Sequence, residues 1–196
     1  SFANDRFRGQ SYHDAVLLID AIQTYRKNNR AYDEKRHRYH AYLAFSKSQQ
    51  TSSYDLLINE TIAELNQYEQ SRTSDIRAFV DLLKSKNRYS RIIKLLIPFL
   101  SLDKDFKKLA IDGVVNVVLK KDDDVKNPKR LSEFCSDSSL CKDAANELVS
   151  LSVFSAKKSD YKTSVLFDSF ASEYFSSDNQ FNNTRCVHVL EELSAR

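Results

Sequence analysis

Residues 89–120 read YSRIIKLLIPFLSLDKDFKKLAIDGVVNVVLK and form the longest strongly apolar part of the chain. Two patterns of apolar residues at helical spacing meet there at the short break Ser101-Leu102-Asp103. Asp103 stands where it can cap the second helix, and Pro98 should kink or shorten the first. Helices with so few polar positions need neighbours on more than one side, so we expect this pair at the centre of a helical stack.

Glycine and proline are scarce, with 2 of each among 196 residues, whereas average proteins contain roughly 7% and 5%. β-Hairpins and phosphate-binding loops need glycine where the backbone takes a positive φ. With Gly9 and Gly113 as the chain's glycines, the composition argues against a β-rich fold and against a glycine-rich nucleotide-binding loop. The sequence therefore predicts an all-α fold.

Hydrophobic residues make up 41% and charged residues 29% of the chain, a balance typical of a folded globular protein. The formal net charge of +3 is too small to indicate a nucleic-acid-binding domain, because such domains concentrate basic residues on one face. No apolar run reaches the roughly 18 to 20 residues of a membrane span. We expect a soluble chain with no membrane span.

The periodic segments predict about ten helices in a single domain of residues 1–196. Connections of roughly 2 to 8 residues favour antiparallel hairpins. The segment KKDDDVKNPKR, residues 120–130, is the best candidate for an exposed linker between an N-terminal and a C-terminal helical half. Its three aspartates, residues 122–124, lack the alternation and the glycine of a calcium-binding loop, so we expect a solvated loop.

Three segments share an aromatic residue followed by apolar residues at helical spacing: SYHDAVLLIDAIQTY (11–25), RYSRIIKLLIPFL (88–100) and DYKTSVLFDSFASEYF (160–175). Pairs of helices recur at roughly 30 to 40 residues, the period of helical-hairpin solenoids. The segments resemble tetratricopeptide repeats in that spacing, but the small-residue positions and the terminal proline of the family are missing. We expect either a tetratricopeptide-like helical-repeat array or an irregular helical bundle.

The segment YRKNNRAYDEKRHRYHAY, residues 25–42, interleaves lysine and arginine with tyrosine and histidine. Basic side chains beside stacking aromatic rings suit a phosphate-rich partner or single-stranded nucleic acid. The alternative is a solvated helix face whose tyrosine rings pack inward under arginine and lysine stems. The candidate binding residues are Arg26, Arg30, Tyr32, Arg36, Tyr39 and His40.

Arg30 and His37 also match the Arg-x(4–6)-His spacing of the HEPN ribonucleases, with Ala31 where that family commonly has a polar residue. The resemblance implies that the arginine and the histidine act on the scissile phosphate without a metal, which makes Arg30 and His37 candidate catalytic residues. His37 and His40 share a helix face at an acceptable metal-ligand spacing, but a metal site needs more ligands. We expect neither a metal nor a cofactor.

Cys135 and Cys141 could close a small disulfide loop in an oxidising compartment, and two free cysteines are the alternative. Cys186 and His188 are two residues apart on a predicted helix, so their side chains diverge and do not form a catalytic pair. The chain contains no methionine, so residue 1 is not a translational start. Together with the cysteine pair, this favours a periplasmic or secreted protein over a cytoplasmic one.

Helical hairpins and aromatic faces are present in the sequence, whereas a clustered catalytic signature is missing. The aromatic stripe at Phe167, Phe170, Tyr174 and Phe175 is more often core than binding groove. We therefore expect a non-enzymatic module that binds another protein, as an adaptor, an assembly factor or an inhibitory partner. The alternative is an RNA-binding protein, or a HEPN-like ribonuclease, that uses residues 25–42.

Overall fold

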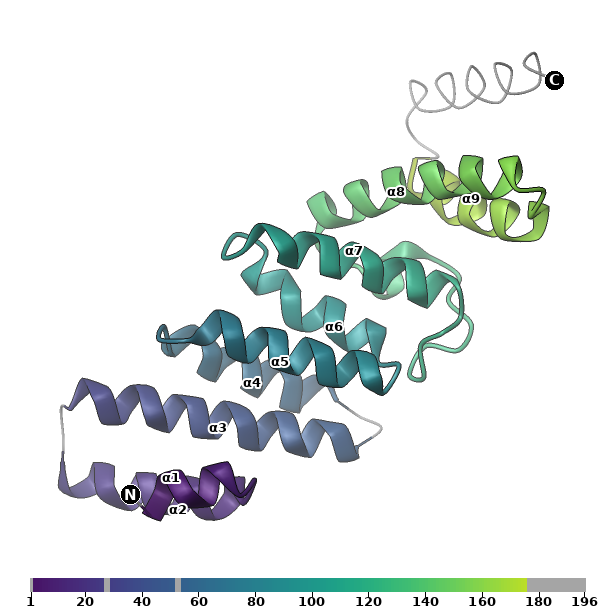
Figure 1. The fold of residues 1–196 in the computed structure, drawn as a ribbon. Coiled ribbons are helices and arrows are strands. Elements are labelled where there is room, and N and C mark those ends of the chain that lie inside the picture. The colour runs from purple at the N-terminus through teal and green to yellow at the C-terminus, as the bar shows by residue number, and fades with distance from the viewer. Residues whose placement is uncertain (1, 27–28, 52–53, 176–196) are drawn as a thin grey trace. The chain divides into compact units, whose positions relative to one another are not determined.

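The computed structural model of the chain describes residues 2–26, 29–51 and 54–175 (Figure 1). These residues form nine α-helices and two short 3₁₀ turns, with no strand among them, which confirms the predicted all-α fold. The last predicted helix, beyond residue 182, lies outside the described residues. Within the described part, no helix is both long and apolar enough to span a membrane.

The chain divides after Lys86 into two compact units. The first unit contains α1 (Phe2–Arg8), α2 (Tyr12–Tyr25), α3 (Arg30–Gln50), α4 (Asp55–Gln67) and α5 (Arg72–Ser85). The second contains α6 (Tyr89–Leu96), the 3₁₀ turn η1 (Ile97–Phe99), α7 (Lys104–Val118), the 3₁₀ turn η2 (Leu131–Glu133), α8 (Ser138–Lys157) and α9 (Tyr161–Phe175). The predicted linker at residues 120–130 is therefore a loop inside the second unit, between α7 and η2.

Helices that follow one another in the first unit pack against each other: α1 on α2, α2 on α3 and α3 on α4 (Figure 1). Residues 1–10, SFANDRFRGQ, are mostly polar, yet residues 2–8 form α1. Ala3 is buried, and the ring of Phe7 stacks on that of Tyr39 with 4.5 Å between centroids. The apolar residues of α1 thus cover the core that α2 and α3 share.

α5 joins the first unit through aromatic contacts with α3. The ring of Phe79 stacks on Phe45 with 4.0 Å between centroids and meets the ring of Tyr42 edge-on at 4.6 Å. Together with the packing on α2 and α4, these contacts give α3 three helical neighbours. Side chains that leave α3 in different directions therefore meet other helices of this unit.

The apolar stretch that begins at Tyr89 forms α6, η1 and α7 in the second unit. As predicted, α6 gives way to a 3₁₀ turn at Pro98, and the Asp103 carboxylate accepts the backbone N–H of Asp105 at 3.0 Å to cap α7. α7 crosses close to α6 at Gly113, where a Cβ atom would lie 3.0 Å from Ile93 Cγ1. Glycine is needed at this position because α6 and α7 approach closely there.

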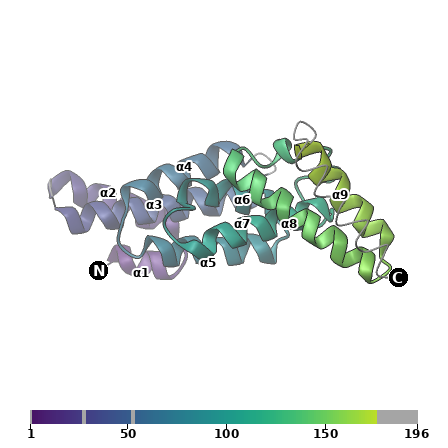
Figure 2. The same cartoon turned by 90° about the horizontal axis from the view of Figure 1, so that it is seen from above.

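α8 and α9 lie side by side as a hairpin (Figure 2). Phe167, Phe170 and Phe175 of α9 are buried, which confirms the predicted core role of these three rings. Tyr174 is half-buried, and its hydroxyl donates to the carbonyl of Ser138 at 2.9 Å. The aromatic stripe of α9 thus packs within the second unit.

Candidate functional site

The predicted binding residues of segment 25–42 lie on α3 or in the connection that precedes it. Because α3 packs against α2, α4 and α5, most of its charged side chains meet groups from those helices. These contacts decide which of the predicted residues remain accessible to a partner.

Asp20 of α2 engages two of the predicted binding residues. Its carboxylate accepts a hydrogen bond from Arg36 Nε at 2.8 Å and lies 3.0 Å from Nε2 of His40. Burial by itself would raise the pKa of Asp20, but the hydrogen bonds and charges of His40 and Arg36 lower it below the ordinary value of 3.8. Asp20 is therefore an anion at neutral pH that holds α3 against α2.

Glutamates on the α4 side of α3 meet the two candidate catalytic residues. Nδ1 of His37 lies 2.6 Å from Oε2 of Glu64, and the histidine side chain is 15% exposed. Arg30 is 81% exposed, yet its guanidinium pairs with Glu34 at 3.2 Å and with Glu69 at 3.3 Å. Arg30 and His37 thus both point toward α4 and the segment that follows it, and each lies beside a carboxylate.

The buried Asp75 of α5 neutralises Arg38. Its carboxylate accepts hydrogen bonds from Arg38 Nη2 at 3.1 Å, from the Tyr42 hydroxyl at 2.7 Å and from the Tyr68 hydroxyl at 2.6 Å. Burial, and then the hydrogen bond to Asp75, raises the pKa of Tyr42 and Tyr68, so both hydroxyls stay protonated donors. These hydrogen bonds connect α3 to α5, so Arg38 has a structural role.

The remaining predicted binding residues differ in accessibility. Tyr39 is 3% exposed, and its hydroxyl donates to the side chain of Asn4, so Tyr39 is a core residue in this fold. Arg26 is exposed, and its guanidinium lies 5.5 Å from the centroid of the Tyr32 ring and donates to the Tyr32 hydroxyl at 3.3 Å. Tyr32 is half-exposed, and the guanidinium of Arg26 already covers its ring, where a base would have to stack.

Two lysines of α3 differ from its arginines and histidines. Within the described ranges, neither Lys35 nor Lys47 makes an ion pair or a hydrogen bond, and both are exposed. Lys47 lines a groove, whereas Lys35 lies outside that lining. The unpaired positive charge of α3 is thus found at two positions, and one of them borders a hollow in the surface.

This groove has a volume of about 270 Å³ and lies between the α1–α2 turn and the C-terminal half of α3. Residues 10–14 form one wall. The other wall is a single helix face, made by Leu43, Ser46, Lys47 and Gln50. Sequence reasoning missed this site, because the spacing along α3 does not show that the α1–α2 turn lies opposite.

The groove is lined mostly by neutral hydrogen-bonding side chains, including the amides of Gln10 and Gln50. Ser11 occupies the N-cap position of α2, but its side chain makes no capping hydrogen bond. Its hydroxyl is therefore not committed to the start of α2. Asp14, the carboxylate of the lining, pairs with Arg6 at 4.0 Å.

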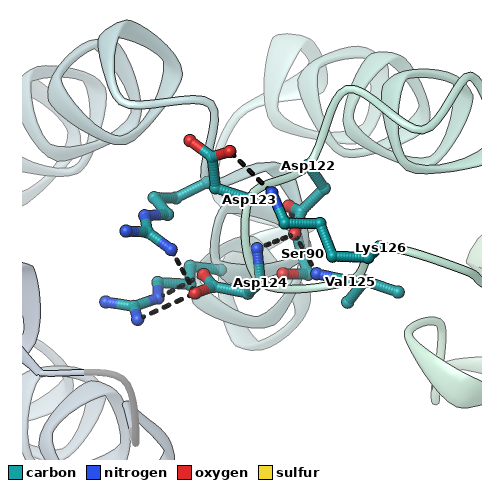
Figure 3. A network of polar contacts seen from close by, with 8 residues as sticks. Ser90, Asp122, Asp123, Asp124, Val125 and Lys126 are labelled. Atoms are coloured by element: carbon teal, nitrogen blue, oxygen red, sulfur yellow. Dashed lines mark hydrogen bonds and ion pairs between the residues drawn. The ribbon is translucent and has the colours of Figure 1, made fainter.

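In the second unit, the aspartate loop at residues 122–124 forms a structural network (Figure 3). Asp122 is 1% exposed, and its carboxylate accepts the backbone N–H of Ser90 at 2.6 Å, at the start of α6. It also accepts the N–H groups of Asp124 at 2.7 Å and Val125 at 2.6 Å. Asp122 therefore stabilises the conformation of its own loop and holds that loop against the start of α6.

Asp124 completes this network with two arginines. Its carboxylate pairs with Arg91 Nε at 2.7 Å and with Arg88, and Arg91 is 1% exposed. Asp123, in contrast, points to solvent and pairs with Lys126 at 2.9 Å. The expected solvated loop is correct for Asp123 but wrong for Asp122 and Asp124, because backbone N–H groups and a buried arginine need anions there.

The structure joins Cys135 and Cys141 as a disulfide, with 5.8 Å between their Cα atoms. Both residues are buried, at 2% and 4% exposure. Cys135 lies three residues before α8, and Cys141 lies in the first turn of α8. Asp137 caps this helix by accepting the N–H of Leu140 at 2.7 Å. Cys186 and His188 lie outside the described residues.

In the described part of the chain, no three or more His, Cys, Asp or Glu residues form a cluster that could hold a metal ion. Comparison of the chain with known protein families, curated proteins and solved structures gives no match.

Proposed function

We propose that the chain is a non-enzymatic helical module that binds another protein, as an adaptor, an assembly factor or an inhibitory partner. The observation that supports this proposal is the pairing of charges around α3. Its three arginines and two histidines all lie beside carboxylates. Within α3, Lys35 and Lys47 are the basic side chains without an ion pair to a described residue, so this helix presents little unpaired positive charge.

A nucleic-acid-binding surface gains most of its affinity when lysine and arginine replace counterions along the phosphates. Around α3, such contacts would break the pairs with Asp20 or bring phosphates beside Glu34 and Glu69. Both changes cost free energy, because a part-buried carboxylate loses its partner or like charges repel. Protein interfaces combine apolar contacts with neutral hydrogen bonds and do not need a free basic face.

The alternative is a HEPN-like, metal-independent ribonuclease. It is favoured by the common orientation of Arg30 and His37 toward α4 and the segment that follows it, and by the 81% exposure of Arg30. Glu64 argues against it, because its carboxylate occupies Nδ1 of His37 at 2.6 Å. A phosphate held by both Arg30 and His37 would lie among carboxylates that repel it.

The test is affinity capture with the full chain from an extract of its source, at two salt concentrations, with and without nuclease. We expect a defined protein that survives nuclease and moderate salt and that binds again when both partners are purified. Arg30→Gln should leave this binding unchanged, since Arg30 is not needed for a protein partner. Recovery of RNA or DNA that collapses with salt and with Arg30→Gln would replace the proposal by its alternative.

A further inference from the structure

We infer that the groove between residues 10–14 and α3 binds an extended acidic peptide segment of the protein partner. This inference rests on the proposed function and adds the binding site and the chemistry of the ligand. Three properties of the groove lead to it: its unpaired positive charge, its neutral hydrogen-bonding groups and its size.

The charge of the groove is complementary to a carboxylate. Lys47 is exposed at the groove and has no ion pair or hydrogen bond to any described residue. His13, also exposed and without a described partner, adds an imidazole that can form a hydrogen bond to a ligand. The carboxylate of Asp14 also lines the groove, and it lies 4.0 Å from the guanidinium of Arg6. Lys47 would therefore attract the acidic side chains of a ligand and orient them in the groove.

The neutral lining matches a peptide backbone. Gln10 and Gln50 are exposed, and each amide offers both a donor and an acceptor. Ser11 and Ser46 add hydroxyl groups, and Ser11 does not use its own to cap α2. An extended peptide presents N–H and C=O groups that all need partners. Amide and hydroxyl side chains can satisfy both kinds, independently of the ligand's sequence.

The size of the groove favours a short segment. About 270 Å³ lies just below the roughly 300–1,000 Å³ of typical small-molecule and cofactor pockets. The apolar lining is limited to Leu43 and Tyr12, both half-buried. The Tyr12 ring is held by Phe7 and Tyr42, each with 5.5 Å between centroids. The site thus suits an apolar side chain flanked by acidic residues.

The test selects short random peptides, displayed on phage, against the full chain and measures the affinity of enriched peptides by fluorescence anisotropy. Lys47→Glu is the diagnostic variant. Lys35→Glu is its matched control, because both are exposed, unpaired lysines of α3 and Lys47 is the one that lines the groove. Ser46→Tyr is a second variant that fills the groove without changing its charge.

We expect the wild-type chain to enrich acidic peptides, and Lys47→Glu to weaken their binding about tenfold or more, the scale of a lost charge pair at an interface. Lys35→Glu should leave the affinity unchanged, and Ser46→Tyr should abolish binding. Lys47 lies in the last turn of α3, where a positive charge also stabilises the helix. Thermal unfolding of each variant therefore accompanies the affinity measurement and identifies any loss of fold.

Enrichment of neutral or basic peptides, or of no peptide at all, would overturn the inference, as would equal weakening by Lys47→Glu and Lys35→Glu. The proposed function is tested separately by the captured protein. If folded Lys47→Glu still binds that protein with full affinity, the interaction function stands and the groove is not its site. If neither form of the chain captures a protein, the proposed function itself fails.

Discussion

At the scale of single residues, one carboxylate can remove two basic side chains from the surface available to a ligand. Asp20 does this for Arg36 and His40, and it also joins α2 to α3. Asp75 pairs with one basic side chain, Arg38, and also accepts hydrogen bonds from two tyrosine hydroxyls. The positive charge of segment 25–42 is therefore used mainly inside the first unit.

The pairing of Asp20 predicts a pH-dependent stability. Burial raises the pKa of Asp20, but the hydrogen bonds and charges of His40 and Arg36 outweigh it and lower the pKa below 3.8. A carboxyl with a depressed folded-state pKa stabilises the fold above its unfolded-state pKa and loses that contribution as the pH falls through the folded-state value. Asp20→Asn should therefore lower the free energy of unfolding at neutral pH, with a diminishing effect below pH 3.8.

Urea denaturation of the wild type and Asp20→Asn across a pH series measures this difference. We expect the difference in free energy of unfolding between the two proteins to be constant above the unfolded-state pKa of Asp20 and to become smaller at lower pH. A gap of the same size at every pH would show that the carboxylate charge contributes nothing and that the substitution acts through packing alone.

At the scale of elements, the loop at residues 120–130 contributes more to the second unit than its charged composition indicates. Asp122 satisfies three backbone N–H groups, including that of Ser90 at the start of α6. Backbone N–H groups that lose a buried partner cost free energy. The loop therefore stabilises the N-terminus of α6, although it follows α7 in sequence.

Asp122→Ala should lower the free energy of unfolding by about 3 kcal/mol, because it leaves buried N–H groups without an acceptor. Asp123→Ala is the matched control: its carboxylate points to solvent in the same loop, so we expect no measurable change. Equilibrium denaturation, with circular dichroism as the signal, compares the two. Equal stability of the two variants would contradict the structural role of Asp122.

At the scale of the whole molecule, the chain forms two units, and each has its own buried core. In the first unit, the core at the N-terminal end includes Ala15, Val16 and Tyr39. In the second, α7 lies against α6 at Gly113. Units of this kind can open independently, as cooperative regions with different free energies.

Overpacking one core should therefore loosen mainly its own unit. Gly113→Val places methyl groups where even a Cβ atom would lie 3.0 Å from Ile93 Cγ1, at a cost of about 1 to 3 kcal/mol. Hydrogen exchange followed by mass spectrometry should show lost protection within residues 87–175. Ala15→Val overpacks the core of the first unit, so protection should be lost there and kept in the second unit. Equal loss in both units for either variant would mean that the two units unfold together.

Much of the fold was predictable because it depends on local chemistry. The scarcity of glycine argues against β-hairpins and phosphate-binding loops, and the apolar spacing at 89–120 predicts two helices. Left-handed turn positions still occur, but Gln10, Ser71, Asn87, Lys120 and Ser159 take them in place of glycine. Asp103 caps α7 through the backbone N–H of Asp105, two residues away, and Pro98 ends α6 because it lacks a backbone donor. Such interactions act within one or two helical turns, so the sequence alone determines them.

The candidate site depends on tertiary structure, because its interactions cross between helices. The partners of Arg36, His37 and Arg38 come from other helices, and helical spacing does not reveal which carboxylates will lie opposite. The burial of Asp122 and the groove beside Lys47 have the same origin. The sequence by itself determined the helices and their apolar faces. Only the packing of helix against helix decided which charges are neutralised and which remain available to a partner, because electrostatic pairing requires proximity in space.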